Sequence, residues 1–280
     1  MITMQYNNFT KKHAALVAAS LTAISAGVAV LTATPSAHAV PPNMRLVWSD
    51  EFTGASVSAM PNSNVWGFDL GGGGWGNNEW QTYVNSWANC HVVWDGTGTD
   101  SQALRIRAER DGAGRYYSAR IKTQGKVAFG PYGYYEARCK FPNAGKGYWP
   151  AAWTLGTNIT SVGWPACGEI DIAEEVNGQW ETHQSLHAPG WDPTSVRTPY
   201  QSTTTYHNYG VMWQPEYITF YIDGVATATY GNGHNSAWVF NKQVFFILNL
   251  AVGGNFPGSP DGSTQVPADF YIDYVRVYQY

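Results

Sequence analysis

The sequence predicts an all-β protein built from two packed antiparallel sheets, on two observations. From Leu46 onward, short runs rich in β-branched and aromatic residues are separated by clusters of Gly, Pro and Asn, which is typical of strands joined by turns. Many of these runs also alternate apolar and polar residues, so one face of each strand is expected to be buried. Two sheets packed face to face would bury these faces with little need for helix.

The main predicted strands follow one another along the whole chain. They lie at residues 103–110, 116–124, 132–141, 169–176, 218–230, 243–254 and 269–280. In the first run, Leu104, Ile106 and Ala108 alternate with charged residues, the pattern of a strand with one buried face. The last run reaches Tyr280, so the C-terminal strand is expected to belong to the sandwich.

Residues 1–39 are predicted to be a secretory signal peptide. Two adjacent lysines precede an apolar run rich in Ala, Ser and Gly, which ends at an Ala-His-Ala sequence. This order is typical of an exported protein cleaved here before Val40. The alternative is a membrane anchor, but the small residues and the cleavage site that follows directly favour removal. We therefore expect a secreted, extracellular protein.

Residues 40–280 are predicted to form a single catalytic domain. A length of about 240 residues suits a large β-sandwich with an ample core. The sequence contains no internal repeat, no low-complexity linker, no charge block and no second apolar stretch long enough to span a bilayer. We expect a monomer.

Composition narrows the classes of partner. Without residues 1–39 the chain has 14 basic and 20 acidic residues, a net charge of −6, which argues against nucleic acid or an anionic membrane surface. The 13 Trp and 18 Tyr residues either fill a core or line a surface that contacts sugar rings. Cys90, Cys139 and Cys167 allow at most one disulfide, and the sequence leaves the pairing open.

The most informative segment is residues 168–175, where several carboxylates stand in a chain with few charges. In a regular strand Glu169 and Asp171 would share one face and Glu174 would point to the other. A β-bulge at Ile172-Ala173 would bring all three to one face, and bulges occur beside active sites because they re-aim side chains. The alternative is a solvated acidic strand, but the interleaved apolar residues require a buried opposite face.

Two carboxyl groups on one face suit glycoside hydrolysis with retention of configuration. That reaction needs one carboxylate to attack the anomeric carbon and a second carboxyl about 5–5.5 Å away to protonate the leaving oxygen. Asp171 lies between the outer two glutamates. It is predicted to hydrogen-bond Glu169, so that Glu169 stays charged while Glu174 stays protonated.

The segment GEIDIAE at 168–174, preceded by GYWPAAW and followed by HAPG, resembles the laminarinase group of glycoside hydrolase family 16. The resemblance extends from LVWSDEF at 46–52 to IDYVRVYQ at 272–279. It implies a β-jelly-roll sandwich with a substrate cleft across its concave sheet. The spacing resembles the bulged E-x-D-x-x-E motif of laminarinases rather than the shorter motif of lichenases, in which Ala173 would be glutamate.

The same resemblance implies a role for each residue of the motif. Glu169 is expected to be the nucleophile, Asp171 the helper and Glu174 the acid/base. No cofactor is expected for catalysis.

Five further residues are similar to substrate-binding positions of the family. Trp149 and Trp153 resemble tryptophans that stack on sugars, and their spacing sends both to the cleft or both to the core. Asn78 and Arg120 resemble contacts to sugar hydroxyls, although either could be structural, Arg120 as the partner of a buried acid. His187 resembles a histidine near the acid/base, where it would tune the pKa of that group; a structural role is the alternative.

A structural calcium ion is also implied by the resemblance. Glu51 and Asp273 match the acidic positions that hold it on the convex side of the family fold. Calcium prefers six to eight oxygen ligands, so backbone carbonyls or water would have to complete the site. The alternative is that both are surface acids near the chain ends.

The sequence therefore predicts endo-hydrolysis of a β-1,3-glucan such as laminarin or curdlan. Mixed-linkage β-1,3-1,4-glucan or a β-galactan are alternative substrates for the same mechanism, because loop shape decides linkage. A non-catalytic glucan-binding protein is an alternative of another class, but it would not need both glutamates. Neither G-x-S-x-G nor H-E-x-x-H occurs, so a serine hydrolase or zinc protease is not expected.

Overall fold

A computed structural model describes residues 41–53, 56–96, 98–178, 181–191, 193, 196–199, 205–233 and 237–280. The described residues form one compact unit. The predicted signal peptide lies outside the described residues. Within them, no helix is long and apolar enough to cross a membrane.

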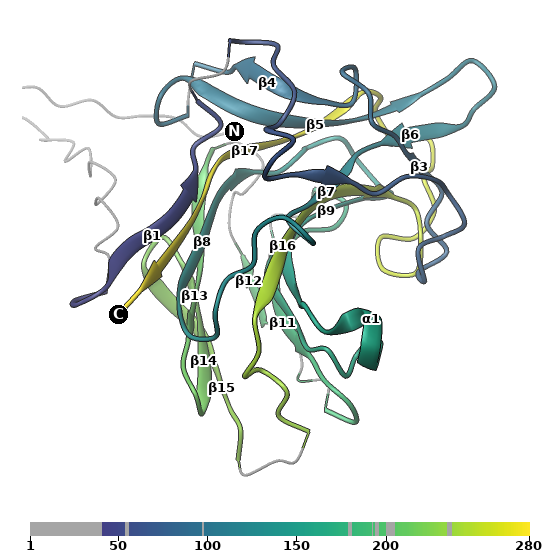
Figure 1. Cartoon of the computed structure of the whole chain (residues 1–280). Helices are drawn as coiled ribbons and strands as arrows, with labels where there is room; N and C mark the ends of the chain where they lie inside the picture. Colours follow the sequence, from purple (N-terminus) through teal and green to yellow (C-terminus); the bar gives the residue numbers. More distant parts are fainter. Residues whose placement is uncertain are drawn as a thin grey trace, which may run out of the picture. The chain divides into compact units, whose positions relative to one another are not determined.

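The chain folds into two β-sheets, which confirms the predicted all-β jelly-roll class (Figure 1). The ten-stranded sheet has the order β15 (Val225–Gly231), β14 (Tyr217–Ile222), β13 (His207–Trp213), β8 (Gly133–Lys140), β17 (Ala268–Gln279), β5 (Gln102–Arg110), β6 (Tyr116–Ser118) and β3 (Thr82–Tyr83). Two further strands join it at its centre: β1 (Arg45–Asp50) pairs with β17, and β4 (Cys90–Trp94) pairs with β5. Its pairs are antiparallel except for the short parallel pair of β3 and β6.

The seven-stranded sheet carries the functional residues described below. Its order is β12 (Val196–Pro199), β11 (Glu181–His187), β10 (Glu169–Glu174), β9 (Tyr148–Gly156), β16 (Val244–Val252), β7 (Arg120–Lys122) and β2 (Gly67–Phe68). The single short helix among the described residues, α1 (Ile159–Val162), lies in the connection from β9 to β10.

The core lies between the two sheets. In β5, Leu104, Ile106 and Ala108 are fully buried while the intervening arginines are partly exposed, as the alternating pattern predicts. In β16, Phe246 and Leu248 belong to the same core cluster. Burial of such side chains stabilises the fold by about 1.5–3 kcal/mol each.

The C-terminal strand β17 belongs to the centre of its sheet, as predicted. It pairs with β8 on one side and with β5 on the other, and with β1 at its C-terminal end. Cys90, Cys139 and Cys167 are free and buried. Because β5 and β17 separate the strands that carry Cys90 and Cys139, these two thiols cannot meet within the sheet.

Candidate active site

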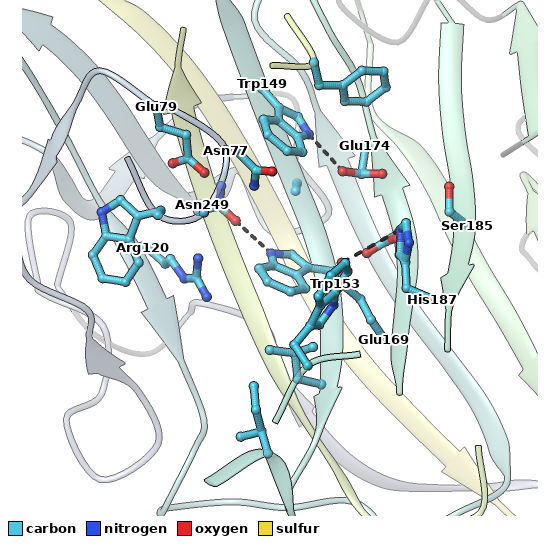
Figure 2. A pocket seen from close by; sticks show the side chains of 18 residues that line it. Asn77, Glu79, Arg120, Trp149, Trp153, Glu169, Glu174, Ser185, His187 and Asn249 are labelled. Carbon is cyan, nitrogen blue, oxygen red and sulfur yellow. Dashed lines mark hydrogen bonds and ion pairs between the residues drawn. The ribbon is translucent and has the colours of Figure 1, made fainter. Parts of the chain in front are cut away.

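A cleft of about 620 Å³ crosses the outer face of the seven-stranded sheet (Figure 2). Its walls combine carboxylates with aromatic rings, the composition expected for a site that binds sugars. The lining residues are Trp75, Gly76, Asn77, Glu79, Arg120, Trp149, Ala151, Trp153, Leu155, Ile159, Trp164, Glu169, Asp171, Glu174, Ser185, His187, Asn249 and Phe256.

Strand β10 contains the predicted bulge. On the β9 side, Asp171 pairs with Trp153, but the register shifts before Ala173 pairs with Ala152. On the β11 side, a shift likewise falls between Asp171 and Glu174. The extra residue is therefore inserted at the predicted position, Ile172-Ala173.

The bulge brings all three acidic residues of the motif to the cleft. Glu169, Asp171 and Glu174 line it, whereas Ile170 and Ile172 point into the core between the sheets. Asp171 is 2% exposed and Glu174 is 8% exposed. This arrangement contradicts the alternative of a solvated acidic strand.

Glu169 is held from the loop that precedes β10. Trp164 donates its indole N–H to Oε2 of Glu169 over 2.6 Å, and Gly168, at φ +80°, turns the loop into the strand. Burial and then the charge of Asp171 raise the pKa of Glu169 well above its usual value, while His187 and the Trp164 donor oppose that rise. Burial thus favours a proton on Glu169, contrary to our expectation, and the donors favour its charge.

Asp171 lies between Glu169 and the next strand. Nε2 of His187 is 3.0 Å from Oδ2 of Asp171 and 4.0 Å from Oε1 of Glu169. Glu169 on β10 and His187 on β11 are directly paired across the two strands, so their side chains lie on the same face of the sheet. The histidine was predicted to tune the pKa of Glu174, and its charge does act to lower that pKa; its ion-pair contacts are with Asp171 and Glu169.

Glu174 lies at the other end of β10 in a different environment. Trp149 donates its indole N–H to Oε1 of Glu174 over 2.8 Å. Burial, opposed by this hydrogen bond and reinforced by the charge of Glu169, raises the pKa of Glu174 to about 7. Glu174 is therefore largely protonated in mildly acidic solution, as a general acid must be.

The raised pKa predicts that Glu174→Gln stabilises the protein at alkaline pH. The native state holds a proton on Glu174 between pH 4.5 and about 7 that the unfolded chain has released, so stability falls as the pH rises through that window. Gln accepts the Trp149 hydrogen bond without a charge. We expect the variant to exceed wild type by up to about 3 kcal/mol at pH 8 and to match it near pH 4.

Denaturant unfolding at both pH values measures this difference. Glu216→Gln, which changes an exposed glutamate on the turn before β14, serves as the control and should behave alike at both. A Glu174→Gln effect of equal size at pH 4 and pH 8 would exclude the assigned pKa.

Both predicted sugar-stacking tryptophans lie in the cleft rather than in the core. Trp149 and Trp153 project from β9 into the cleft, as Figure 2 shows. Trp149 meets the ring of Phe256 edge to face, with centroids 5.3 Å apart. Trp153 donates its N–H to Oδ1 of Asn249 on β16 over 2.7 Å.

Arg120 combines the two roles that the sequence left open. On β7 it forms an ion pair with Asp69 at 2.9 Å, so it is the partner of a partly buried acid. Its guanidinium also lies 5.1 Å from the ring centre of Trp75 and 4.9 Å from that of Trp153. Arg120 therefore lines the cleft, paired with Asp69 and close to the rings of two tryptophans.

Asn78 is not among the cleft-lining residues. It has a positive φ of 57°, and its amide donates to Asn255 over 2.8 Å on the surface. The preceding residue, Asn77, lines the cleft instead. The predicted loop therefore reaches the cleft through Asn77, whereas Asn78 bonds to Asn255 at the surface, because turn geometry decides which side chain points inward.

Several cleft residues were missed by sequence reasoning. Trp75 and Glu79 belong to the aromatic, glycine-rich loop at residues 71–80, whose composition was a usable signal. Trp164, Asn249 and Phe256 carried no such signal. Their side chains reach the cleft from the loop before β10, from β16 and from the loop after it.

The two predicted calcium ligands each contact a cation of the protein. Glu51 accepts two hydrogen bonds from Arg276, at 2.9 and 2.8 Å. Asp273 accepts from the backbone N–H of Thr99 and faces Arg138 at 3.5 Å. Carboxylates neutralised in this way do not provide the oxygen-rich shell that calcium prefers, so we assign calcium no part in the function, and its presence stays a prediction.

The fold and the cleft together define a class of protein. Carboxyl groups at the two ends of one bulged segment have distinct environments, and tryptophans flank them in an open cleft large enough for sugar units. Two carboxyls in such a cleft, each with its own indole donor, are the machinery of glycosidic bond cleavage. The class is that of the glycoside hydrolases.

Comparison with known proteins gives the family. The model of glycosyl hydrolases family 16 matches residues 79–276. A laminarinase catalytic domain from Thermotoga maritima has a similar structure, with a TM-score of 0.75 and 36% identity over 85% of this chain and 98% of that one. The chain belongs to glycosyl hydrolase family 16, and the predicted resemblance is confirmed.

Two curated relatives support the assignment. A beta-glucanase of Rhodothermus marinus is 34% identical over 257 residues, which cover 85% of this chain and 86% of the relative. Glucan endo-1,3-beta-glucosidase A1 of Niallia circulans is 32% identical over 275 residues, which cover 84% of this chain and 38% of that longer protein.

Proposed function

We propose that this glycoside hydrolase cleaves β-1,3-glucan internally and with retention of configuration. The observation that carries the proposal is the bulge in β10, which places Glu169 and Glu174 in one cleft with different partners. The names of the relatives, laminarinase and glucan endo-1,3-beta-glucosidase, support β-1,3-glucan as the substrate.

In the first step Glu169 attacks the anomeric carbon and Glu174 protonates the leaving oxygen. Trp164 occupies Oε2 of Glu169 as a donor, which stabilises the negative charge of the nucleophile. Trp149 occupies Oε1 of Glu174, so the transferable proton resides on Oε2. The attack forms a glycosyl ester on Glu169 and releases the leaving chain as an alcohol.

The second step reverses these roles. Glu174, now a carboxylate, takes a proton from water, and the oxygen of that water attacks the anomeric carbon and displaces Glu169. Two inversions give net retention. A proton on Asp171 would remove the charge that raises the pKa of Glu169, and Asp171 could then donate a hydrogen bond to the Glu169 carboxylate.

Substrate choice and stereochemistry are tested together. We expect laminarin to be cut faster than lichenan, a β-1,3-galactan or cellulose at equal mass, and new reducing ends observed by proton NMR to appear first as the β-anomer. If lichenan or galactan is cut at least tenfold faster than laminarin, the proposed substrate is wrong. If the α-anomer appears first, the proposed double displacement is wrong.

We further infer that residues 1–39 direct export and that the enzyme acts outside the cell as a monomer. A signal-type N-terminus and a polymeric substrate too large to enter a cell support export; the monomeric state stays a prediction. The mass of the protein in the culture medium tests it, because cleavage before Val40 gives a defined N-terminus.

A further inference from the structure

A chain of hydrogen bonds leads away from the indole edge of Trp153. The indole N–H of Trp153 donates to Oδ1 of Asn249 over 2.7 Å, and Nδ2 of Asn249 donates to the hydroxyl oxygen of Tyr83 over 3.2 Å. The hydroxyl of Tyr83 lies 3.3 Å from Oε2 of Glu79 and donates to it. In Figure 2, Asn249 lies between Glu79 and Trp153.

The chemistry of these groups allows the chain only one direction. An indole N–H can only donate, so Asn249 must present its oxygen to Trp153 and its NH₂ to Tyr83. Tyr83 then accepts from Asn249 and has its own proton left to donate. An ionised carboxylate can only accept, so Glu79 is the acceptor at which the chain ends.

Glu79 is itself fixed from a second direction. Gln81 donates its NH₂ to the same oxygen, Oε2, and accepts with its own carbonyl the backbone N–H of Val252 at the end of β16. Tyr83 and Gln81 are each 1% exposed, so both bonds to Glu79 come from rigid, buried donors. The nearby Arg120 and the donor bonds favour the charged form of Glu79 and oppose the effect of burial, which raises its pKa.

We propose that Glu79 is a positioning residue that holds the ring of Trp153 in the orientation needed to stack on the glucan. The inference rests on the proposed function, because it assumes that a sugar unit occupies the face of Trp153. Its physical basis is that an indole free to rotate would lose side-chain freedom on binding each sugar. The hydrogen-bond chain that ends at Glu79 fixes the ring before the sugar binds, so this entropy is not lost on binding.

The test uses the Glu169→Gln variant as the parent protein, because this variant should not hydrolyse its ligand. Calorimetry measures how tightly the parent binds a hexasaccharide of β-1,3-linked glucose. Into this parent we introduce Glu79→Ala, Tyr83→Phe and both together. We expect each single change to weaken binding about fivefold to twentyfold and the double change to weaken it no further, because either change interrupts the same chain. Glu79→Gln keeps an acceptor oxygen and should retain most of the affinity.

The matched control is Tyr271→Phe, which removes a tyrosine hydroxyl bonded to Asp269 on the ten-stranded sheet. It should leave affinity at the parent value. Tyr83→Phe retains the buried ring, so it tests the proposal even where Glu79→Ala lowers stability. Losses that multiply in the double variant, or a loss with Glu79→Ala but none with Tyr83→Phe, would show that Glu79 does not act through Trp153.

The same titrations separate this inference from the proposed function. If the Glu169→Gln parent binds no β-1,3-glucan hexasaccharide, the proposed substrate is wrong. If the parent binds, and Glu79→Ala, Tyr83→Phe and the double variant all bind as tightly as the parent, the proposed substrate is retained and the positioning role is wrong.

Discussion

Glu169→Gly is expected to abolish laminarin hydrolysis, and added azide is expected to restore cleavage of an aryl β-glucan substrate with a good leaving group. Glycine removes the nucleophile and leaves space in a site where Glu169 is otherwise enclosed by Trp164, His187 and Asp171. We expect turnover of laminarin to fall by at least about a thousandfold. Azide fills the vacated space and attacks the anomeric carbon in place of the carboxylate.

The product identifies the role of the residue. Azide attack in a single displacement inverts the anomeric centre, so the glycosyl azide should have the α-configuration by NMR. Glu169→Gln serves as the control that retains the side-chain shape: it should lose activity and gain nothing from azide, since no space is opened. A β-glycosyl azide from the Glu169→Gly variant would show that Glu174 is the nucleophile and Glu169 the acid/base.

Glu174→Gln should lower kcat/KM on laminarin by about a hundredfold to ten-thousandfold, because the leaving sugar then departs without a proton. Aryl glycosides with acidic phenols need little protonation to leave, so their first step should be much less affected. The difference between the two substrate classes is the signature of an acid/base.

The pH profile gives the second measurement on Glu174. Its acid form predominates below a pKa of about 7, so kcat/KM of the wild type should fall as the pH rises through about 7 in the free enzyme. In Glu174→Gln this alkaline limb should disappear. Glu216→Gln, an exposed glutamate outside the cleft, should keep both rate and profile, and an unchanged alkaline limb in Glu174→Gln would assign it to another group.

Features set by residues close together in the sequence could be predicted, whereas features set by the packing of distant residues could not. The bulge in β10 was predictable because three acidic residues and three apolar residues in one short segment satisfy opposite faces only with an inserted residue. The shared direction of Trp149 and Trp153 was predictable from strand periodicity, but whether they face the cleft depends on which side of β9 the other sheet covers. Packing against the core decided that question.

The sequence by itself determined the β-class of the fold, the bulged acidic motif and the loop that supplies polar contacts to the cleft. These features depend on residue alternation and on turn-forming residues that act within a few positions of one another. Only the tertiary structure decided that His187 lies beside Asp171 and Glu169, because the register of β10 against β11 sets that contact. Likewise, the connection from Trp153 to Glu79 joins residues from three segments that are distant in the sequence, and contacts between distant segments have no periodicity that a sequence could reveal.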